Sequence, residues 1–314
     1  MHAEITEWRQ DFHENPELLY DTVRTSKIVS EKLNSFGCDV VKTGIGRTGV
    51  VAVIKGRSDS KGKVIGLRAD MDALPIKEIT GLDYSSKNDG KMHACGHDGH
   101  TAMLLGAAKY LTETRNFDGT VVVIFQPAEE GGAGAKEMCD DGLMSDFDIS
   151  EVYGMHNAPG LPVGQFNIRP GAFFAAADQF TLDIEGKGGH AARPQETIDP
   201  TIVGAQILIA LQSVVSRNTD PLESLVVSVT SFRTESDSYN VIPQTVQLRG
   251  TVRTLSKEVR DMAQEKITQL IKNTALTYGA KVNLNYARGY PVMINSELET
   301  NYMVDVAKKV TGDN

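Results

Sequence analysis

The stretch at residues 92–100 reads MHACGHDGH, and the rest of the chain is interpreted outward from it. Five of its nine side chains bind metals or move protons: His93, Cys95, His97, Asp98 and His100. A polar segment precedes the stretch, and an apolar run typical of a helix follows it. A loop that enters a helix has a backbone free to aim ligands and a rigid support behind it. We therefore predict that this loop contributes to a dinuclear metal site in a hydrolase.

Strands and helices are predicted to alternate through the first half of the chain. The predicted strands cover residues 38–42, 49–55, 64–69, 121–125 and 152–155. The predicted helices cover residues 22–36, 99–113 and 134–141, with Gly37 as the C-terminal cap of the first. Apolar strands of this kind are buried on both faces. We expect an α/β fold with a mostly parallel central sheet flanked by helices, and with reactive groups at the carboxyl ends of its strands.

The pattern changes at about residue 178. Alternating strands, an apolar helix at 200–216 and a second helix at 256–277 give the order β-α-β-β-α-β, which is that of a ferredoxin-like sandwich. We expect residues 178–289 to form a domain inserted into a catalytic domain made of residues 1–177 and 290–314.

Composition excludes several classes of protein. The net charge of −9 and the lack of a Lys/Arg-rich run argue against a nucleic-acid partner. The longest mainly apolar run, at 202–215, is shorter than the roughly 20 residues that a membrane span needs. The polar N-terminus does not resemble a signal peptide, and three scattered cysteines do not make a disulfide framework. We expect a cytoplasmic protein in which Cys95 stays reduced.

Cys95 and His97 are the first candidate ligands. They are two residues apart, so both side chains can lie on one side of an extended loop. A thiolate with an imidazole suits zinc, or manganese, cobalt or nickel. A thiol hydrolase that uses Cys95 and His97 as nucleophile and base is a weaker alternative, because residues so close in sequence do not easily face each other.

Acidic and imidazole side chains follow two further strands. Glu129 and Glu130 are adjacent, so one side chain can bind metal while the other takes a proton from water. The same pair could instead be a solvated acidic turn. His156 follows an apolar strand in the same way, and its alternative is a buried structural histidine.

Two aspartates and one glycine-flanked histidine complete the candidates. Asp70 and Asp72 follow the strand at 64–69, and one of them could support a ligand histidine through a hydrogen bond. His190 lies in the segment GKGGHAARP and could stabilise an oxyanion, or it could be a turn residue without a role. We assign no ligand role to His93 or to His100.

Seven segments together resemble the metal-dependent aminoacylase and glutamate-carboxypeptidase superfamily, in the branch of hippurate hydrolase and the amidohydrolases of indoleacetyl-amino acids. They occur in the family's order along nearly the whole chain, which makes the resemblance specific. The segments are WRQDFHENPEL at 8–18, LRADMDALPI at 67–76, MHACGHDGHTAMLLGAA at 92–108, VIFQPAEEGGAGA at 123–135, YGMHN at 153–157, GKGGHAARP at 186–194 and NVIP at 240–243.

The resemblance implies a role for each matching residue. Two divalent ions, manganese or zinc with nickel and cobalt as alternatives, would be held by Cys95, His97, Glu130 and His156. Glu129 would be the general base, supported by Asp72 or, as a second choice, Asp70. The family's inserted domain dimerises, so residues 178–289 would form a homodimer. His190 would then enter the partner's active site, and Asn240 would be a weaker candidate for contacting substrate.

The resemblance also implies an activity, but the sequence departs from the family pattern at one point. The family has a fifth ligand, a histidine near the C-terminus, but no histidine follows His190 here. We expect an incomplete chain rather than an altered mechanism. The predicted activity is hydrolysis of an N-acyl amino acid, hippurate-like or N-acetyl, to a carboxylic acid and a free amino acid. An exopeptidase and a non-catalytic binding relative are the alternatives, and the sequence does not define the acyl group, the amino acid or the metal.

Overall fold

The computed structural model describes residues 1–312, which divide into two compact units, Met1–Leu161 and a second that begins at Pro162. Each unit has its own hydrophobic core. No helix among residues 1–312 combines the length and the apolar character that crossing a bilayer requires. The predicted boundaries at residues 178 and 289 stay predictions.

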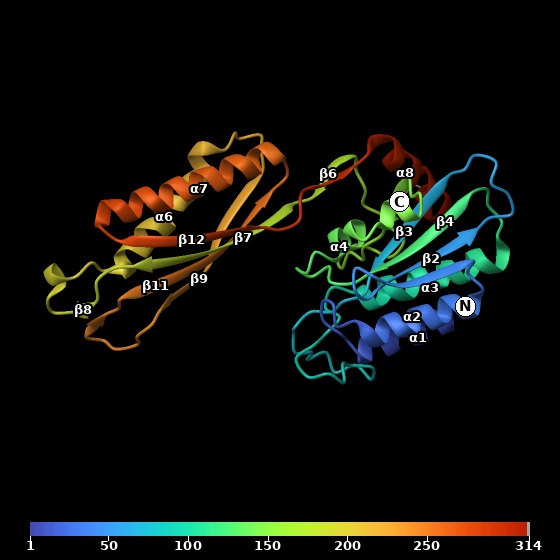
Figure 1. The fold of residues 1–314 in the computed structure, drawn as a ribbon, viewed down its shortest axis with the longest axis horizontal. Coiled ribbons are helices and arrows are strands. Elements are labelled where there is room, and N and C mark those ends of the chain that lie inside the picture. The colour runs from blue at the N-terminus through green and yellow to red at the C-terminus, as the bar shows by residue number, and fades with distance from the viewer. Residues whose placement is uncertain (313–314) are drawn as a thin grey trace. The chain divides into compact units, whose positions relative to one another are not determined.

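A five-stranded sheet with helices on both faces forms the first unit (Figure 1). Its strands are β1 (Val40–Ile45), β2 (Gly49–Lys55), β3 (Val64–Asp70), β4 (Thr120–Gln126) and β5 (Glu151–Gly154). Its helices are α1 (His2–Glu14), α2 (Val23–Phe36), α3 (His97–Thr114), α4 (Gly134–Asp140) and α5 (Leu143–Asp146). Helix α2 ends at Gly37, whose φ of 83° is the left-handed cap conformation that was predicted.

Burial on both faces explains why the central residues of β2 and β4 are all apolar. On β4, Val123 and Phe125 face the core that contains α1, α2 and α3, whereas Val122 and Ile124 face α4 and α5. Strands covered on both sides cannot alternate apolar with polar residues. The predicted α/β class with a helix-flanked central sheet is confirmed.

The direction of the strands differs from the prediction of a mostly parallel sheet. The sheet order is β1-β2-β4-β3-β5, in which β4-β3 and β3-β5 pair in parallel but β1-β2 and β2-β4 pair antiparallel. Only a short turn joins β1 to β2, and a parallel pair needs a crossover of a dozen or more residues. The sheet is therefore mixed, and its parallel part is β4-β3-β5.

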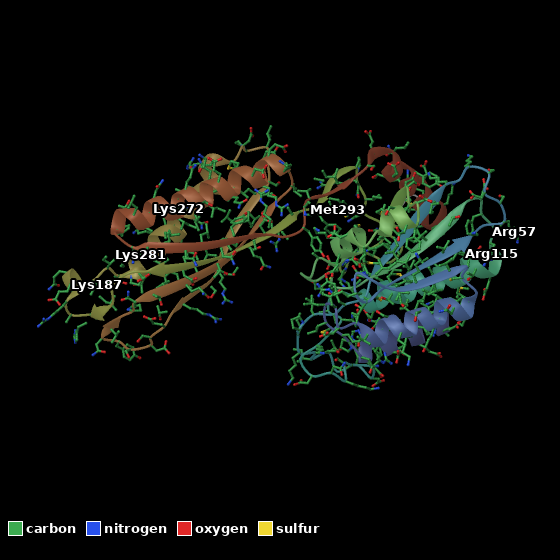
Figure 2. The ribbon with its side chains drawn as sticks, in the orientation of Figure 1. Arg57, Arg115, Lys187, Lys272, Lys281 and Met293 are labelled. Atoms are coloured by element: carbon green, nitrogen blue, oxygen red, sulfur yellow. The ribbon has the colours of Figure 1, made fainter. Side chains whose placement is uncertain are left out.

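The carboxyl ends of β4, β3 and β5 lie at one edge of this sheet because the three strands are parallel. The connection from β3 to β4 runs through α3 on one face, and that from β4 to β5 runs through α4 and α5 on the other. The two strands that follow β3 in the chain, β4 and β5, therefore lie on opposite sides of it in the sheet. Open α/β sheets bind ligands at such a switch point in the strand order. Elsewhere in the unit, Arg115, which is labelled in Figure 2, joins α3 to the strands. Its guanidinium donates to the Asp39 carboxylate and to the Lys55 carbonyl.

A four-stranded antiparallel sheet covered by two helices dominates the second unit (Figure 1). Its strands and helices are β7 (Ala176–Glu185), α6 (Pro200–Asn218), β9 (Leu225–Thr234), β11 (Thr245–Thr254), α7 (Lys257–Tyr278) and β12 (Lys281–Arg288). Their order along the chain is the predicted β-α-β-β-α-β. The sheet order is β12-β7-β11-β9 with all pairs antiparallel, as in a ferredoxin-like sandwich.

Shorter elements complete the second unit. They are β6 (Gly171–Phe174), β8 (Gly189–His190), the 3-10 turn η1 (Pro194–Glu196), β10 (Val241–Ile242), β13 (Met293–Asn295) and α8 (Glu297–Thr311). Strands β8 and β10 pair with each other, and so do β6 and β13.

A charged cluster at the start of β7 is fully hydrogen-bonded. Asp178, which is 1% exposed, accepts from Arg260 Nε at 3.0 Å and from Nη2 at 2.5 Å. It also accepts from the Tyr286 hydroxyl and the Gly289 N–H, both at 3.1 Å. The cluster thereby joins β7, α7, β12 and the segment after β12, and burial raises the pKa of Tyr286.

Candidate metal centre

Three strand ends and one helix start bring the predicted site residues of the first unit together. Asp70 ends β3, and Asp72 follows it. The Glu129–Glu130 pair comes after β4, and His156 comes after β5. Cys95 and His97 arrive from the other direction, where the long segment after β3 enters α3. All of these candidates therefore lie at the edge where the parallel strands end.

His97 is oriented by its main-chain contact. The side chain is fully buried, and Nδ1 lies 2.7 Å from the Asp72 carbonyl oxygen, to which it donates. The proton is then on Nδ1, and the Nε2 lone pair is available to a metal. Nε2 has no hydrogen-bond partner among residues 1–312, and it lies 3.8 Å from Glu130 Oε1, which also has none.

A cation fits the electrostatics around His97. Burial lowers its pKa, but the contacts with Asp72 and Cys95 and the charge of Asp70 outweigh burial and raise it to about 11. The groups around His97 thus favour positive charge at this position, which a metal ion at Nε2 would supply in place of the second ring proton. Unpaired buried ligand atoms are also rare in folded proteins, so the two facing atoms of His97 and Glu130 are the feature expected of a metal site.

Three groups of candidate ligand atoms share His97, and two of them contain the predicted ligands. Atoms of Cys95, His97 and His156 lie within 4.8 Å of one another, and so do atoms of His97, Glu129 and Glu130. Within the first group, Cys95 Sγ is 3.4 Å from His156 Nε2. His156 Nδ1 is 2.7 Å from the Asn157 carbonyl oxygen, which leaves Nε2 facing the thiol. The two groups of predicted ligands lie on either side of the shared His97, an arrangement consistent with a dinuclear centre.

The two aspartates do different things. Asp72 accepts from the Glu129 N–H at 2.8 Å and from the Glu130 N–H at 3.1 Å, so it fixes the turn that carries both glutamates. Asp70 instead contacts Arg68 Nη1 at 2.8 Å and His100 Nδ1 at 2.6 Å. These interactions hold the pKa of Asp70 far below its usual range in spite of burial. Asp72 is thus the aspartate directly connected to the glutamate pair.

Glu129 has the electrostatics of a base. Burial, followed by the like charges of Glu130 and Asp70, raises the pKa of its carboxyl group. The local backbone is tight, because a Cβ on Gly134 would lie 1.8 Å from the Pro127 carbonyl oxygen. The glycines after the glutamate pair therefore allow the sharp turn between β4 and α4.

Sequence reasoning did not assign the contacts of several buried polar residues behind the candidate site. His100 bonds Asp70 and Asn157, and Asp98 accepts from His13 Nδ1 at 2.8 Å and from Arg9 Nε at 2.7 Å. The signal in the sequence was the spacing of His97 and His100, which lie one helical turn apart, and the position of Asn157 directly after His156. His93 is buried, which lowers its pKa to about 4, and neither of its ring nitrogens has a partner among residues 1–312.

His190 and Asn240 lie next to each other in the second unit. His190 pairs with Val241 in the β8–β10 ladder, and the Ala191 N–H donates to the Asn240 carbonyl at 3.0 Å. His190 Nδ1 accepts from the Ala192 N–H at 3.1 Å, so the ring proton is on the exposed Nε2. His190 therefore presents a hydrogen-bond donor to solvent.

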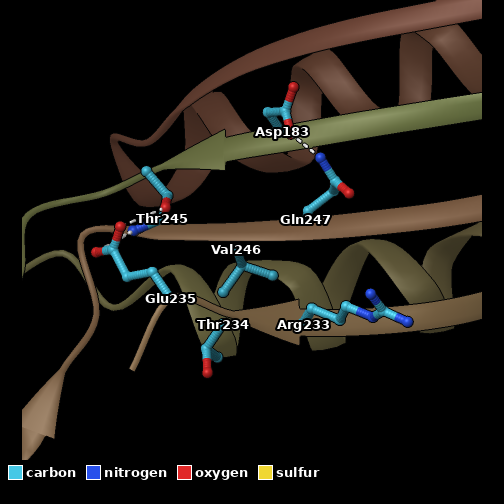
Figure 3. A pocket seen from close by; sticks show the side chains of 7 residues that line it. All are labelled: Asp183, Arg233, Thr234, Glu235, Thr245, Val246 and Gln247. Carbon is cyan, nitrogen blue, oxygen red and sulfur yellow. Dashed lines mark hydrogen bonds between the residues drawn. The ribbon is translucent and has the colours of Figure 1, made fainter. Parts of the chain in front are cut away.

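A hollow of about 240 Å³ in the second unit has a different character (Figure 3). Four of its polar side chains are paired with one another: Gln247 donates to Asp183 at 2.8 Å, and Thr245 donates to Glu235 at 2.9 Å. This self-paired lining gives no reason to place a ligand there.

Comparison with known proteins agrees with the geometry. The chain belongs to peptidase family M20/M25/M40, whose model matches residues 66–314. The predicted resemblance is thereby confirmed. Hippurate hydrolase of Campylobacter jejuni is 43% identical over 314 residues, which are 100% of this chain and 80% of that protein. N-acetylcysteine deacetylase of Bacillus subtilis is 42% identical over 310 residues, which are 98% of this chain and 80% of that protein.

A solved structure is similar over the same range. The Bacillus subtilis YxeP protein, described as a dinuclear metal-binding peptidase of the M20 family, matches with a TM-score of 0.81 and 38% identity. The match covers 98% of this chain and 80% of that one.

Proposed function

We propose that this chain is a metal-dependent amidohydrolase that cleaves N-acyl amino acids, hippurate-like or N-acetyl, into a carboxylic acid and a free amino acid. The observation that carries the proposal is the pair of facing, buried and unpartnered atoms of His97 and Glu130, with Cys95 and His156 beside them. The names of the two relatives support the substrate class, because both describe hydrolysis of an acylated amino acid.

The proposed centre holds two divalent ions through Cys95, His97, Glu130 and His156. Manganese or zinc is the first choice, with cobalt and nickel as alternatives, because a thiolate with imidazoles suits these metals. The dinuclear metal binding described for the YxeP protein supports two ions rather than one. Bound ions would polarise the scissile carbonyl and lower the pKa of water towards about 7.

The protein's own groups then have defined tasks. Glu129, with its raised pKa, takes a proton from the attacking water and passes it to the leaving amine. Asp72 keeps Glu129 and Glu130 in place through their backbone N–H groups. His190, entering the active site of the partner in the dimer, would donate from Nε2 to the substrate carbonyl oxygen, where negative charge develops, and Asn240 would contact the substrate nearby.

Residues 178–289 are proposed to act as an inserted dimerisation domain between the two parts of a catalytic domain, 1–177 and 290–314. Edge strand β9 leaves backbone groups unpaired on one side, and exposed Val226 lies on it. Helix α6 packs beside β9 and exposes Ile202 and Ile209. Light scattering on the purified protein should give a dimer, and Ile209→Glu should shift it to a monomer. A cytoplasmic location is part of the proposal, since it would keep Cys95 reduced.

A substrate panel on metal-reconstituted protein tests the activity. Hippurate and N-acetyl amino acids should be hydrolysed faster than dipeptides, and chelator-treated protein should be inactive until metal is restored. Faster hydrolysis of dipeptides would favour the exopeptidase, an alternative that the peptidase description of YxeP supports. A purified chain that binds no metal would indicate a non-catalytic relative.

A further inference from the structure

His100 is a buried imidazole that the proposed chemistry does not use. It is 3% exposed and lies in the first turn of α3, one helical turn after His97. Its Nδ1 is 2.6 Å from Asp70 Oδ1, and Asp70 is a carboxylate held by Arg68. Because a carboxylate only accepts hydrogen bonds, the proton of His100 must be on Nδ1.

The other ring nitrogen is occupied as well. The Asn157 backbone nitrogen is 3.0 Å from His100 Nε2, and the side-chain oxygen Oδ1 of Asn157, which only accepts hydrogen bonds, is 2.6 Å from the same nitrogen. His100 is near enough to Asp70 and His97 to form a ligand group with them, but both of its nitrogens already have protein partners. A metal could bind His100 only by breaking the contact with Asp70 or the contact with Asn157.

Asn157 in turn lies directly on the loop that carries two proposed ligands. A Cβ added to Gly96 would lie 2.4 Å from Asn157 Oδ1, so the amide packs against the Gly96 backbone between Cys95 and His97. Gly96 also has a φ of 88°, which L side chains rarely adopt. On the opposite segment, the His156 ring meets the His100 ring edge to face, with 4.6 Å between their centroids.

We propose that His100 and Asn157 are positioning residues that set the spacing between Cys95 and His156, and with it the affinity for the ion held by the thiolate. Asp70 fixes His100, His100 seats Asn157 and the ring of His156, and Asn157 covers Gly96. The segment after β5 and the loop before α3 are thus held together by residues that bind no metal. This inference rests on the proposed metal centre and adds a second layer to it.

Co²⁺ titration of metal-free protein tests the inference without measuring activity. The thiolate–Co²⁺ absorption reports the ion bound to Cys95, and Cys95→Ser should abolish it. Asn157→Ala and His100→Asn should each weaken Co²⁺ binding by about 10- to 100-fold, the usual effect of losing an outer-shell partner. The double variant should be no weaker than about one single variant, because both changes break the same contact.

Two further variants make the result specific. His100→Gln places an amide near the position of Nε2 and keeps a contact with Asn157, so it should bind Co²⁺ more tightly than His100→Asn. Asn88→Ala removes an amide from the same long segment, where it donates to the Pro16 carbonyl away from the ligands, and should leave affinity unchanged. Thermal unfolding of each metal-free variant shows that the fold is retained.

Three results would overturn the inference. Unchanged affinity in Asn157→Ala and His100→Asn would do so while leaving the metal centre of the wild type intact. If His100→Asn bound one Co²⁺ ion fewer than the wild type and Asn157→Ala did not, His100 would be a metal ligand and not a positioning residue. Absence of Co²⁺ binding by the wild type would instead refute the proposed function itself, and the inference with it.

Discussion

Both units bury acidic side chains, but the two sets differ in what their atoms bind. In the second unit, Asp178 accepts hydrogen bonds from Arg260, Tyr286 and Gly289. In the first unit, His97 Nε2 and Glu130 Oε1 face each other across 3.8 Å without a hydrogen-bond partner among residues 1–312. Both sets are buried and charged. The set at the strand ends of the first unit differs because it contains ligand atoms without a hydrogen-bond partner.

The difference separates a structural cluster from the proposed metal centre. An aspartate saturated by a guanidinium and two further donors connects elements and has no capacity left for a ligand. Unpaired buried atoms cost free energy, and a fold retains them where a ligand completes them. Variants of the strand-end residues around His97 and Glu130 should therefore change metal binding or chemistry, and variants around Asp178 should change stability alone.

The largest effect is expected at Glu129. Glu129→Gln keeps the shape of the side chain but removes the base, so turnover should fall by roughly 100- to 10,000-fold. Metal content, measured by elemental analysis, should stay at the wild-type value. Glu130→Gln is the matched control, one residue away, and should lose metal. If Glu129→Gln lost the metal instead, the roles of the two glutamates would be reversed.

The next effect concerns Asp178. Asp178→Ala leaves the buried Arg260 guanidinium without its partner, which should cost about 3–5 kcal/mol of the free energy of unfolding. Urea denaturation measures the loss, and Co²⁺ affinity of the folded fraction should not change. A marked change in metal affinity would mean that the two sets of acidic residues are not independent.

A smaller effect is expected from metal addition. An ion that binds only the folded chain stabilises it by about 2.7 kcal/mol when present at 100 times its dissociation constant. Mn²⁺ should therefore raise the midpoint of thermal unfolding of the wild type and of Arg260→Lys. His97→Ala should lose most of this shift, because His97 belongs to all three candidate ligand groups among the described residues. Equal shifts in wild type and His97→Ala would place the ion elsewhere.

Sequence alone predicted the edge of the sheet at which the site lies. Apolar strands followed by Asp70, by Glu129 and by His156 indicate strand ends, and parallel strands end at one edge. The helix end at Gly37 was also predictable, because glycine adopts the positive φ of a helix C-cap without steric cost. Such features are predictable because each depends on neighbours in the chain.

Contacts between distant segments were not predictable in this way. His100 meets Asn157 across 57 residues, and His13 meets Asp98 across 85. The periodicity of a helix or a strand does not indicate which distant residue a side chain will contact. The sequence around a buried histidine also does not show whether it binds a metal or a carboxylate. The antiparallel pairing of β2 with β4 was missed for the same reason, since it depends on which strands become neighbours.

The smallest effect is expected at His13, far from the strand ends in sequence. The hydrogen bond to Asp98 raises the pKa of His13 above its ordinary value of 6.5, although burial opposes this. Protonated His13 therefore stabilises the fold fully below about pH 6.5, and this stability is lost as the pH rises through the raised pKa. His13→Gln should cost about 1.5 kcal/mol at low pH, the lower end for a hydrogen bond to a charged group.

Urea unfolding of the metal-free protein, measured from about pH 6 upward, gives the difference between wild type and His13→Gln at each pH. Other titrating groups occur in both proteins and cancel in that difference, so a decreasing difference isolates His13. A constant difference would show a neutral imidazole whose contact with Asp98 is an ordinary hydrogen bond. Glu78 Oε1 also lies 3.3 Å from His13 Nε2, so Asp98→Asn should remove most rather than all of this pH dependence. Because Asp98 also accepts from Arg9, the same change should remove a further, pH-independent part. That result would show that the contact between His13 and Asp98, like the contact between Arg260 and Asp178, is a charged interaction that stabilises the fold.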